Sequence, residues 1–172
     1  AALGRARMMA GDMAGAKAAV SEAERLVAGA TDREKGHVSA MVTLLSGDAP
    51  GTRAAVRAHL RDHPRDALIA QLCASVFGLI GFSGEVGREA DLLAYTSGLL
   101  PHYGDDWWMM SMHAIALCET GKLTASHDLM EKSLALNPRN ANAAHFKAHA
   151  LYEAGETATG RAFLDAWLTA YD

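Results

Sequence analysis

Two histidines and a glutamate spaced four residues apart form the most chemically suggestive pattern in this sequence: His145, His149 and Glu153. Residues at this spacing lie on one face of an α-helix. Such a histidine pair can supply half of a zinc site, and the carboxylate one turn further on could be a third ligand or a general base. The helical metalloprotease motif needs a glutamate directly after the first histidine, where this chain has Phe146, so that motif is absent.

The same spacing is more often that of histidines that form hydrogen bonds along a binding groove or within helix packing. His37 and His113 would complete a cluster only if the fold brought them next to the pair. We therefore predict no metal and no cofactor. Metal binding or proton transfer at His145, His149 and Glu153 is kept as the alternative.

Large aromatic and sulfur-containing side chains gather at residues 107–112, which read Trp-Trp-Met-Met-Ser-Met. An exposed tryptophan is a good anchor for a binding partner, and the alternative is that both Trp107 and Trp108 belong to the core. The three methionines favour adaptable packing over a copper site.

The elements that position these residues follow a repeating frame. Five glycines recur at intervals of 36, 34, 40 and 34 residues, and a small residue stands seven positions before each: Gly11, Gly47, Gly81, Gly121 and Gly155, preceded by Gly4, Ala40, Ala74, Ala114 and Ala148. Pro64 and Pro138 each lie 17 residues after a frame glycine. Glycine permits the turn inside a helical hairpin, and proline ends the second helix before the next hairpin begins. This is the tetratricopeptide-repeat pattern.

The frame predicts an all-α fold, a right-handed superhelical solenoid of tetratricopeptide-like hairpins. We expect residues 1–172 to form a single domain of about five hairpins, the first one partial, within a longer chain. The expected helices are residues 1–10, 12–28, 33–46, 52–62, 67–80, 85–100, 107–120, 123–136, 141–154 and 157–171. Residues 67–80 are apolar nearly all round, which indicates a central, buried helix. The longest interval predicts extra connecting residues at 101–106.

Composition excludes several classes of function. The net charge of −4 has mixed signs along the chain and offers no basic surface for nucleic acid. No apolar run is long enough for a membrane span, and the first residues do not resemble a signal peptide. Cys73 and Cys118 lack metal or redox spacing, so we expect free, buried thiols in a reducing, cytoplasmic setting.

Four stretches of this chain resemble the tetratricopeptide repeat protein 38 family: residues 33–38, 63–68, 117–121 and 145–149, the last together with Glu153, Gly155 and Gly160. The resemblance covers nearly the whole chain and is most specific over residues 60–167. It implies an all-helical repeat protein of which this segment is the middle, and it implies no particular reaction. Asn140, Asn142 and the pair Ser126-His127 depart from the family pattern and mark a divergent, bacterial-type member.

In such a repeat, the first helix of each hairpin lines a concave groove. Counting back from the frame glycines places ten residues there: Glu34, His37, Gln71, Ser75, Trp108, Ser111, His145, His149, Tyr152 and Glu153. The lysines and asparagines that would clamp a peptide carboxylate are missing from these positions. We predict a protein-interaction or scaffold module that binds a peptide or partner helix, with possible self-association and without nucleic acid or membrane partners. The alternative is an enzyme or a protein that binds a small molecule or metal at the His145, His149 and Glu153 face.

Overall fold

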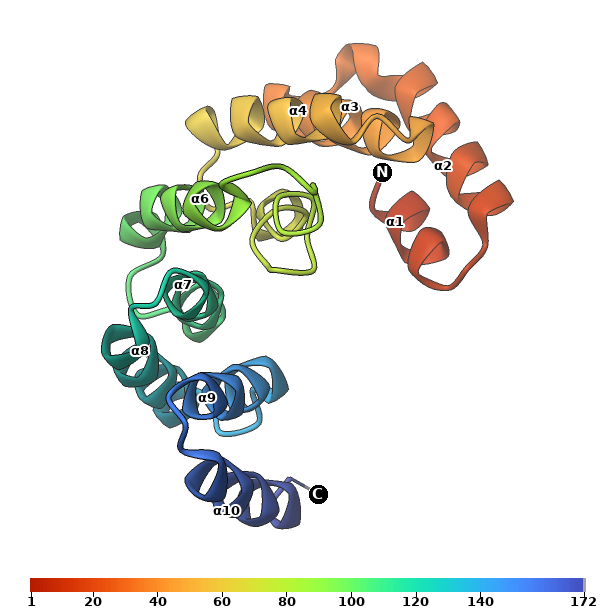
Figure 1. Ribbon diagram of the computed structural model, residues 1–172. Helices are drawn as coiled ribbons and strands as arrows, with labels where there is room; N and C mark the ends of the chain where they lie inside the picture. Colours follow the sequence, from red (N-terminus) through yellow and green to blue (C-terminus); the bar gives the residue numbers. More distant parts are fainter. Residues whose placement is uncertain (172) are drawn as a thin grey trace. The chain divides into compact units, whose positions relative to one another are not determined.

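Helices and turns make up the computed structural model of this protein, which describes residues 1–171 and contains no strand within them (Figure 1). The helices are α1 (Ala2–Met9), α2 (Met13–Leu26), the short 3-10 helix η1 (Val27–Gly29), α3 (Asp32–Ser46), α4 (Ala49–Asp62), α5 (Ala67–Ala70), α6 (Arg88–Tyr103), α7 (Trp107–Glu119), α8 (Leu123–Leu136), α9 (Ala141–Glu153) and α10 (Thr157–Thr169). The predicted all-α class is confirmed. None of the helices in residues 1–171 combines the length and apolarity that crossing a membrane would require.

The chain divides into two compact units, Ala1–Cys73 and Ala74–Asp172. In unit 1, α1 packs on α2, α2 on α3, and α3 on α4. In unit 2, each helix from α6 to α10 packs on the next, and α7 also packs on α9. The first helices of two consecutive hairpins in unit 2, α7 and α9, therefore lie side by side, as expected in a helical repeat. The assignment of the whole chain to one repeat domain stays a prediction.

The frame glycines end helices as predicted at four of five positions. Gly11, Gly47, Gly121 and Gly155 have φ angles of 79°, 83°, 75° and 78°, in the left-handed region that residues with a Cβ avoid. At the start of the following helix in unit 1, Asp12 and Asp48 each accept a hydrogen bond from the backbone three residues on. The hairpin turns are thus encoded locally.

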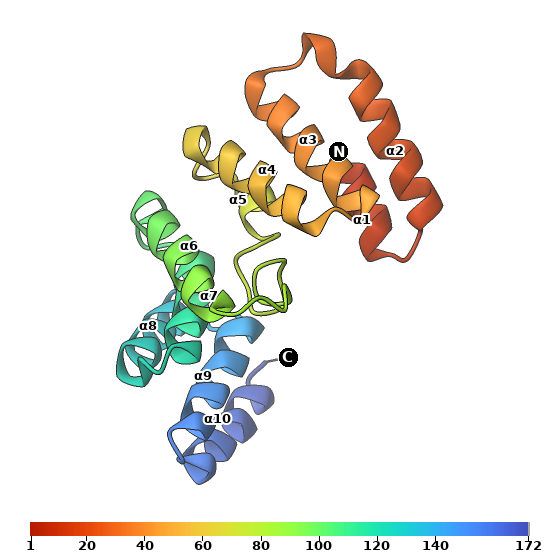
Figure 2. The same ribbon diagram turned by 45° about the horizontal axis from the view of Figure 1, so that its top comes forward.

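The predicted helix over residues 67–80 is wrong. α5 ends at Ala70, and residues 74–87, hereafter the irregular segment, run in a series of turns before α6 (Figure 2). Glycines at 78, 81, 84 and 87 each disfavour a helix by about 1 kcal/mol relative to alanine. Ser75 Oγ also accepts a hydrogen bond from the Phe77 backbone, a local alternative to helical bonding.

The third frame glycine was therefore misassigned. Gly81 has no positive φ, and a Cβ at this position would collide with the Val76 backbone, so its role is close chain approach. The next helix starts at Arg88 because Gly87 takes a φ of 82°. It runs through Pro101 to Tyr103, where the sequence predicted a connection. Buried Tyr103 packs against Trp108, with ring centroids 5.7 Å apart, and holds this last turn in place.

Buried serines fasten α7 to its neighbours in unit 2. Ser126 Oγ donates to the Ala114 carbonyl at 2.7 Å, an approach that the small, fully buried Ala114 permits. Ser133 Oγ donates to the Trp107 carbonyl at 2.7 Å, and Asn140 Nδ2 donates in turn to Ser133 Oγ at 3.0 Å. These bonds connect α7, α8 and the start of α9, so the helices that carry the side chains of α7 and α9 are held in fixed positions relative to each other.

Candidate functional site

The sequence-predicted groove residues of unit 1 lie in different settings. Glu34 caps α3: its carboxylate accepts from the Thr31 backbone and hydroxyl, and these two bonds, the backbone bond foremost, lower the pKa of Glu34. His37 is partly buried, with no hydrogen-bond partner for Nε2. Gln71 donates to the Leu68 carbonyl at 3.4 Å. Glu34 and His37 both line a pocket of about 420 Å³ whose other residues are Ala1, Ala2, Ala23, Leu26, Val27, Ala30, Arg33, Val38 and Leu68.

A buried polar network lies next to His37. The Asp66 side chain, 1 % exposed, accepts hydrogen bonds at one oxygen from His59 Nε2 at 3.0 Å and Arg33 Nε at 2.9 Å. Burial alone would raise the pKa of Asp66, but these two bonds outweigh it and hold the pKa below its usual value. The other nitrogen of His59 lies against Gly36, where solvent has no access. The network is therefore structural, and it anchors the chain after α4 to α3.

Among the predicted residues of unit 2, Ser111 is fully buried and donates to the Trp108 carbonyl at 2.8 Å, so a ligand has no access to it. Trp108 is half-buried against Tyr103, while Trp107 is 39 % exposed. Tyr152 is exposed on α9.

His149 is the centre of a small charged group. Its Nε2 lies 3.4 Å from Glu119 Oε1, at the end of α7, and 3.9 Å from Glu153 Oε1, at the end of α9. The neighbouring α7 carboxylate had no signal in the sequence, because it lies 30 positions earlier in the chain. Within residues 1–171, no three histidine, cysteine or acidic side chains stand together in a way that would hold a metal ion.

His145 and His113 have separate environments. His145 stacks on Phe77 of the irregular segment, with ring centroids 6.5 Å apart and planes 17° from parallel, and it also contacts Phe146 at 5.4 Å. His113 Nδ1 lies 2.9 Å from the Thr96 hydroxyl, and burial lowers the pKa of His113. The pair His145 and His149 thus has an aromatic neighbour at one end and carboxylates at the other.

A pocket of about 390 Å³, hereafter the aromatic pocket, lies between these two ends. It is lined by Val76, Phe77, Gly81, Phe82, Gly84, Arg88, Glu89, Leu92, Glu119 and His149. Phe77 and Phe82 contact each other edge to face at 5.7 Å, yet they are 61 % and 72 % exposed. Sequence reasoning missed both phenylalanines because it placed them in and directly after a buried helix. The glycines of the irregular segment, three residues apart, were the signal that could have revealed them.

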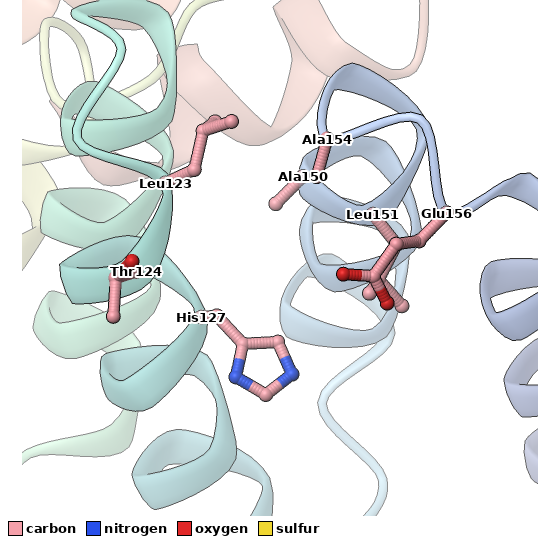
Figure 3. Close-up of a pocket in the computed structure, with 7 residues that line it drawn as sticks. All are labelled: Leu123, Thr124, His127, Ala150, Leu151, Ala154 and Glu156. Atoms are coloured by element: carbon pink, nitrogen blue, oxygen red, sulfur yellow. The ribbon is translucent and has the colours of Figure 1, made fainter.

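A further pocket of about 290 Å³ lies in unit 2 between α8 and the end of α9 (Figure 3). Leu123, Ala150 and Leu151 supply apolar surface, and the His127 ring and Glu156 carboxylate point into the space between the helices. His127 Nε2 already lies 3.5 Å from Glu131 on its own helix, and Glu131 also pairs with a lysine of α9. This pocket offers less exposed aromatic surface than the aromatic pocket, which we take as the candidate site.

Comparison with known proteins places the fold. PilW, a widely conserved type IV pilus biogenesis factor, matches with a TM-score of 0.69 and 18% identity over 97% of this chain and 74% of its own. A MamA mutant matches with a TM-score of 0.61 and 15% identity over 98% of this chain and 90% of its own. MamA MSR-1 matches with a TM-score of 0.61 and 15% identity over 96% of this chain and 91% of its own. No family model matches the sequence, and neither does any curated protein.

The helical hairpins, their glycine turns and these structural matches together define a tetratricopeptide-like helical repeat protein. At this level of identity, the matches establish the fold alone.

Proposed function

We propose that unit 2 binds a peptide or helix of a partner protein at the aromatic pocket. The observation that carries this proposal is the pair Phe77 and Phe82, both more than half exposed at the edge of a pocket of about 390 Å³. Exposed phenylalanine costs solvation free energy, about 25 cal/mol for each Å² of apolar surface left in water. Clustered aromatic side chains with an adjoining cavity are typical of the anchors that dominate protein interfaces.

The surroundings support binding by a preorganised surface. His145 stacks on Phe77 from α9, and α9 is packed on α7 and α8. A partner would therefore meet aromatic rings that are already partly held in place, which lowers the entropy cost of association. The fold shared with PilW, a pilus biogenesis factor, supports a role in assembly. Membership of the tetratricopeptide repeat protein 38 family, self-association and a cytoplasmic location stay predictions.

The alternative, chemistry at His145, His149 and Glu153, has no observation in its favour. His145 and Glu153 stand eight residues apart on one helix, about 12 Å along its axis. His145 is engaged with aromatic rings, and His149 is engaged with two carboxylates. An enzyme site would need these groups to converge on one reacting atom.

The test uses a phage-displayed library of random 12-residue peptides selected on the full chain, with affinities of the selected peptides measured by fluorescence anisotropy. The Phe82→Ala variant should weaken binding at least tenfold, because it removes an anchor without opening the core. The matched control is Leu168→Ala on α10, another exposed apolar residue, 59 % exposed, which lies outside the pocket and should leave the affinity unchanged. If no peptide is selected, or Phe82→Ala binds selected peptides as well as the wild type does, the proposal is wrong.

A further inference from the structure

Carboxylates surround the aromatic pocket. Glu89 and Glu119 line it, and Glu153 lies one contact away through His149. Glu119 and Glu153 are the last residues of α7 and α9, with side chains 31% and 50% exposed. These three carboxylates are hereafter the acidic rim.

Helix geometry strengthens the negative potential at two members of the acidic rim, Glu119 and Glu153, whereas Glu89 lies in the first turn of α6, at the positive end of that helix. The C-terminal end of an α-helix carries a partial negative charge, so a glutamate there is unfavourable where a lysine would be favourable. Two consecutive first helices, α7 and α9, both end in glutamate on this side of unit 2. Their ends therefore add to the potential of the carboxylates.

The cations beside the acidic rim do not balance it. Arg88 lies 2.9 Å from Glu89 and pairs with that carboxylate. Glu119 and Glu153 share one imidazole, His149. Three carboxylates against one guanidinium leave two net negative charges when His149 is neutral and one when it is protonated. The Cys118 thiol is affected by the same carboxylates. Burial is the largest of the causes that together raise the pKa of Cys118 to about 11, and the negative charges of Glu119 and Glu153 are the others.

We infer that the partner is a peptide segment with a bulky apolar side chain next to a lysine or arginine. The apolar side chain enters the aromatic pocket against Phe77 and Phe82, and the cation lies against Glu119 and Glu153. This inference rests on the proposed function and specifies the chemistry of its partner. A cation in this position supplies the missing positive charge and also interacts favourably with the two helix ends. An acidic segment would meet repulsion from the same groups.

The experiment compares peptide selections from the same library on the wild-type chain and on the double variant Glu119→Lys, Glu153→Lys. Peptides selected on the wild type should carry lysine or arginine next to a Phe, Leu, Ile, Met or Trp, and the double variant should bind them roughly tenfold or more weakly. Selections on the double variant should favour Asp or Glu at that place. Replacing the basic residue of a selected peptide by glutamate should restore affinity for the double variant. Wild-type affinity should fall as salt rises.

Controls separate charge from folding. Glu24→Lys makes the same charge change on an exposed residue of α2, in unit 1, and should leave binding unchanged. Thermal unfolding of the double variant should occur at or above the wild-type temperature, because lysine suits a helix C-terminus.

Two further outcomes tell the proposals apart. Selected peptides that depend on Phe82 but show no excess of lysine or arginine, and bind the double variant unchanged, overturn this inference and leave the proposed function standing. An absence of peptides that depend on Phe82 overturns both.

Discussion

A single glycine in α3 controls the buried polar network of unit 1. A Cβ built on Gly36 would lie less than 3.0 Å from Nδ1 of His59, closer than real side chains approach. His59 has little room to move, because its side chain is 1% exposed and its Nε2 is bonded to Asp66 at 3.0 Å. The Gly36→Ala substitution should therefore push the imidazole away from the carboxylate.

The expected magnitude follows from two opposing effects. Alanine gains about 1 kcal/mol over glycine in a helix interior. Losing the buried hydrogen bond between His59 and the charged Asp66 costs about 1.5–3 kcal/mol. The net effect of Gly36→Ala is a loss of about 0.5–2 kcal/mol of unfolding free energy, that is, a fall of several degrees in melting temperature for a unit of this size.

Gly98 provides a matched control in α6. The same substitution there meets no atom within 4 Å and keeps only the gain in helix propensity. Gly98→Ala should therefore stabilise by about 0.5–1 kcal/mol, with a sign opposite to that of Gly36→Ala.

The assay is urea and thermal unfolding followed by circular dichroism. Peptide-resolved hydrogen exchange also measures the stability of each compact unit separately. A double variant isolates the steric cause: the three atoms nearest to a Cβ at position 36 all belong to the His59 ring, so in a His59→Ala background Gly36→Ala should become stabilising by about 1 kcal/mol. Stabilisation by Gly36→Ala in the wild type, or destabilisation that persists without His59, would refute the reasoning.

Three other predictions concern protonation and backbone geometry. Burial lowers the pKa of His37 and His113; the unfolded chain then binds protons that the folded chain does not, so stability should be full above about pH 6.5 and fall below it. The urea midpoints at pH 7.5 and at pH 5.5 measure this loss of stability. The double variant His37→Gln, His113→Gln should show a smaller difference between the two midpoints, and an unchanged difference would argue against the reasoning. Gly121→Ala, at a φ of 75°, should cost about 1–2 kcal/mol in urea unfolding, whereas a neutral effect would mean that the turn tolerates a Cβ. Cys118, with its pKa raised to about 11, should react with iodoacetamide at pH 8 at least about a hundredfold more slowly in the folded chain than in urea, and equal rates would contradict its burial.

The hairpin frame was predictable because its causes are local. A glycine that must adopt positive φ, as at Gly11 or Gly121, ends a helix through the conformation of one residue. Asp12 and Asp48 start the next helix through a hydrogen bond three residues away. Cys73 and Cys118 are both buried, and neither forms a disulfide within residues 1–171, as their spacing and the apolar character of their surroundings indicated.

The irregular segment was predicted wrongly as a helix because two local preferences compete there. Its apolar residues indicate a buried helix, while its four glycines destabilise that helix. Which preference prevails depends on packing energies that a local pattern does not contain. Pro101 shows the reverse case, since packing of Tyr103 on Trp108 carries the helix past a residue that normally ends one.

By itself, the sequence determined the helical class, four of the five glycine turns and the shared helical face of His145, His149 and Glu153, because each depends on residues a few positions apart. Only the tertiary structure decided what surrounds that face. Phe77 stacks on His145 from 68 positions away, and Glu119 reaches His149 from 30 positions away. Such contacts form when segments far apart in the chain pack together, and no local spacing records them.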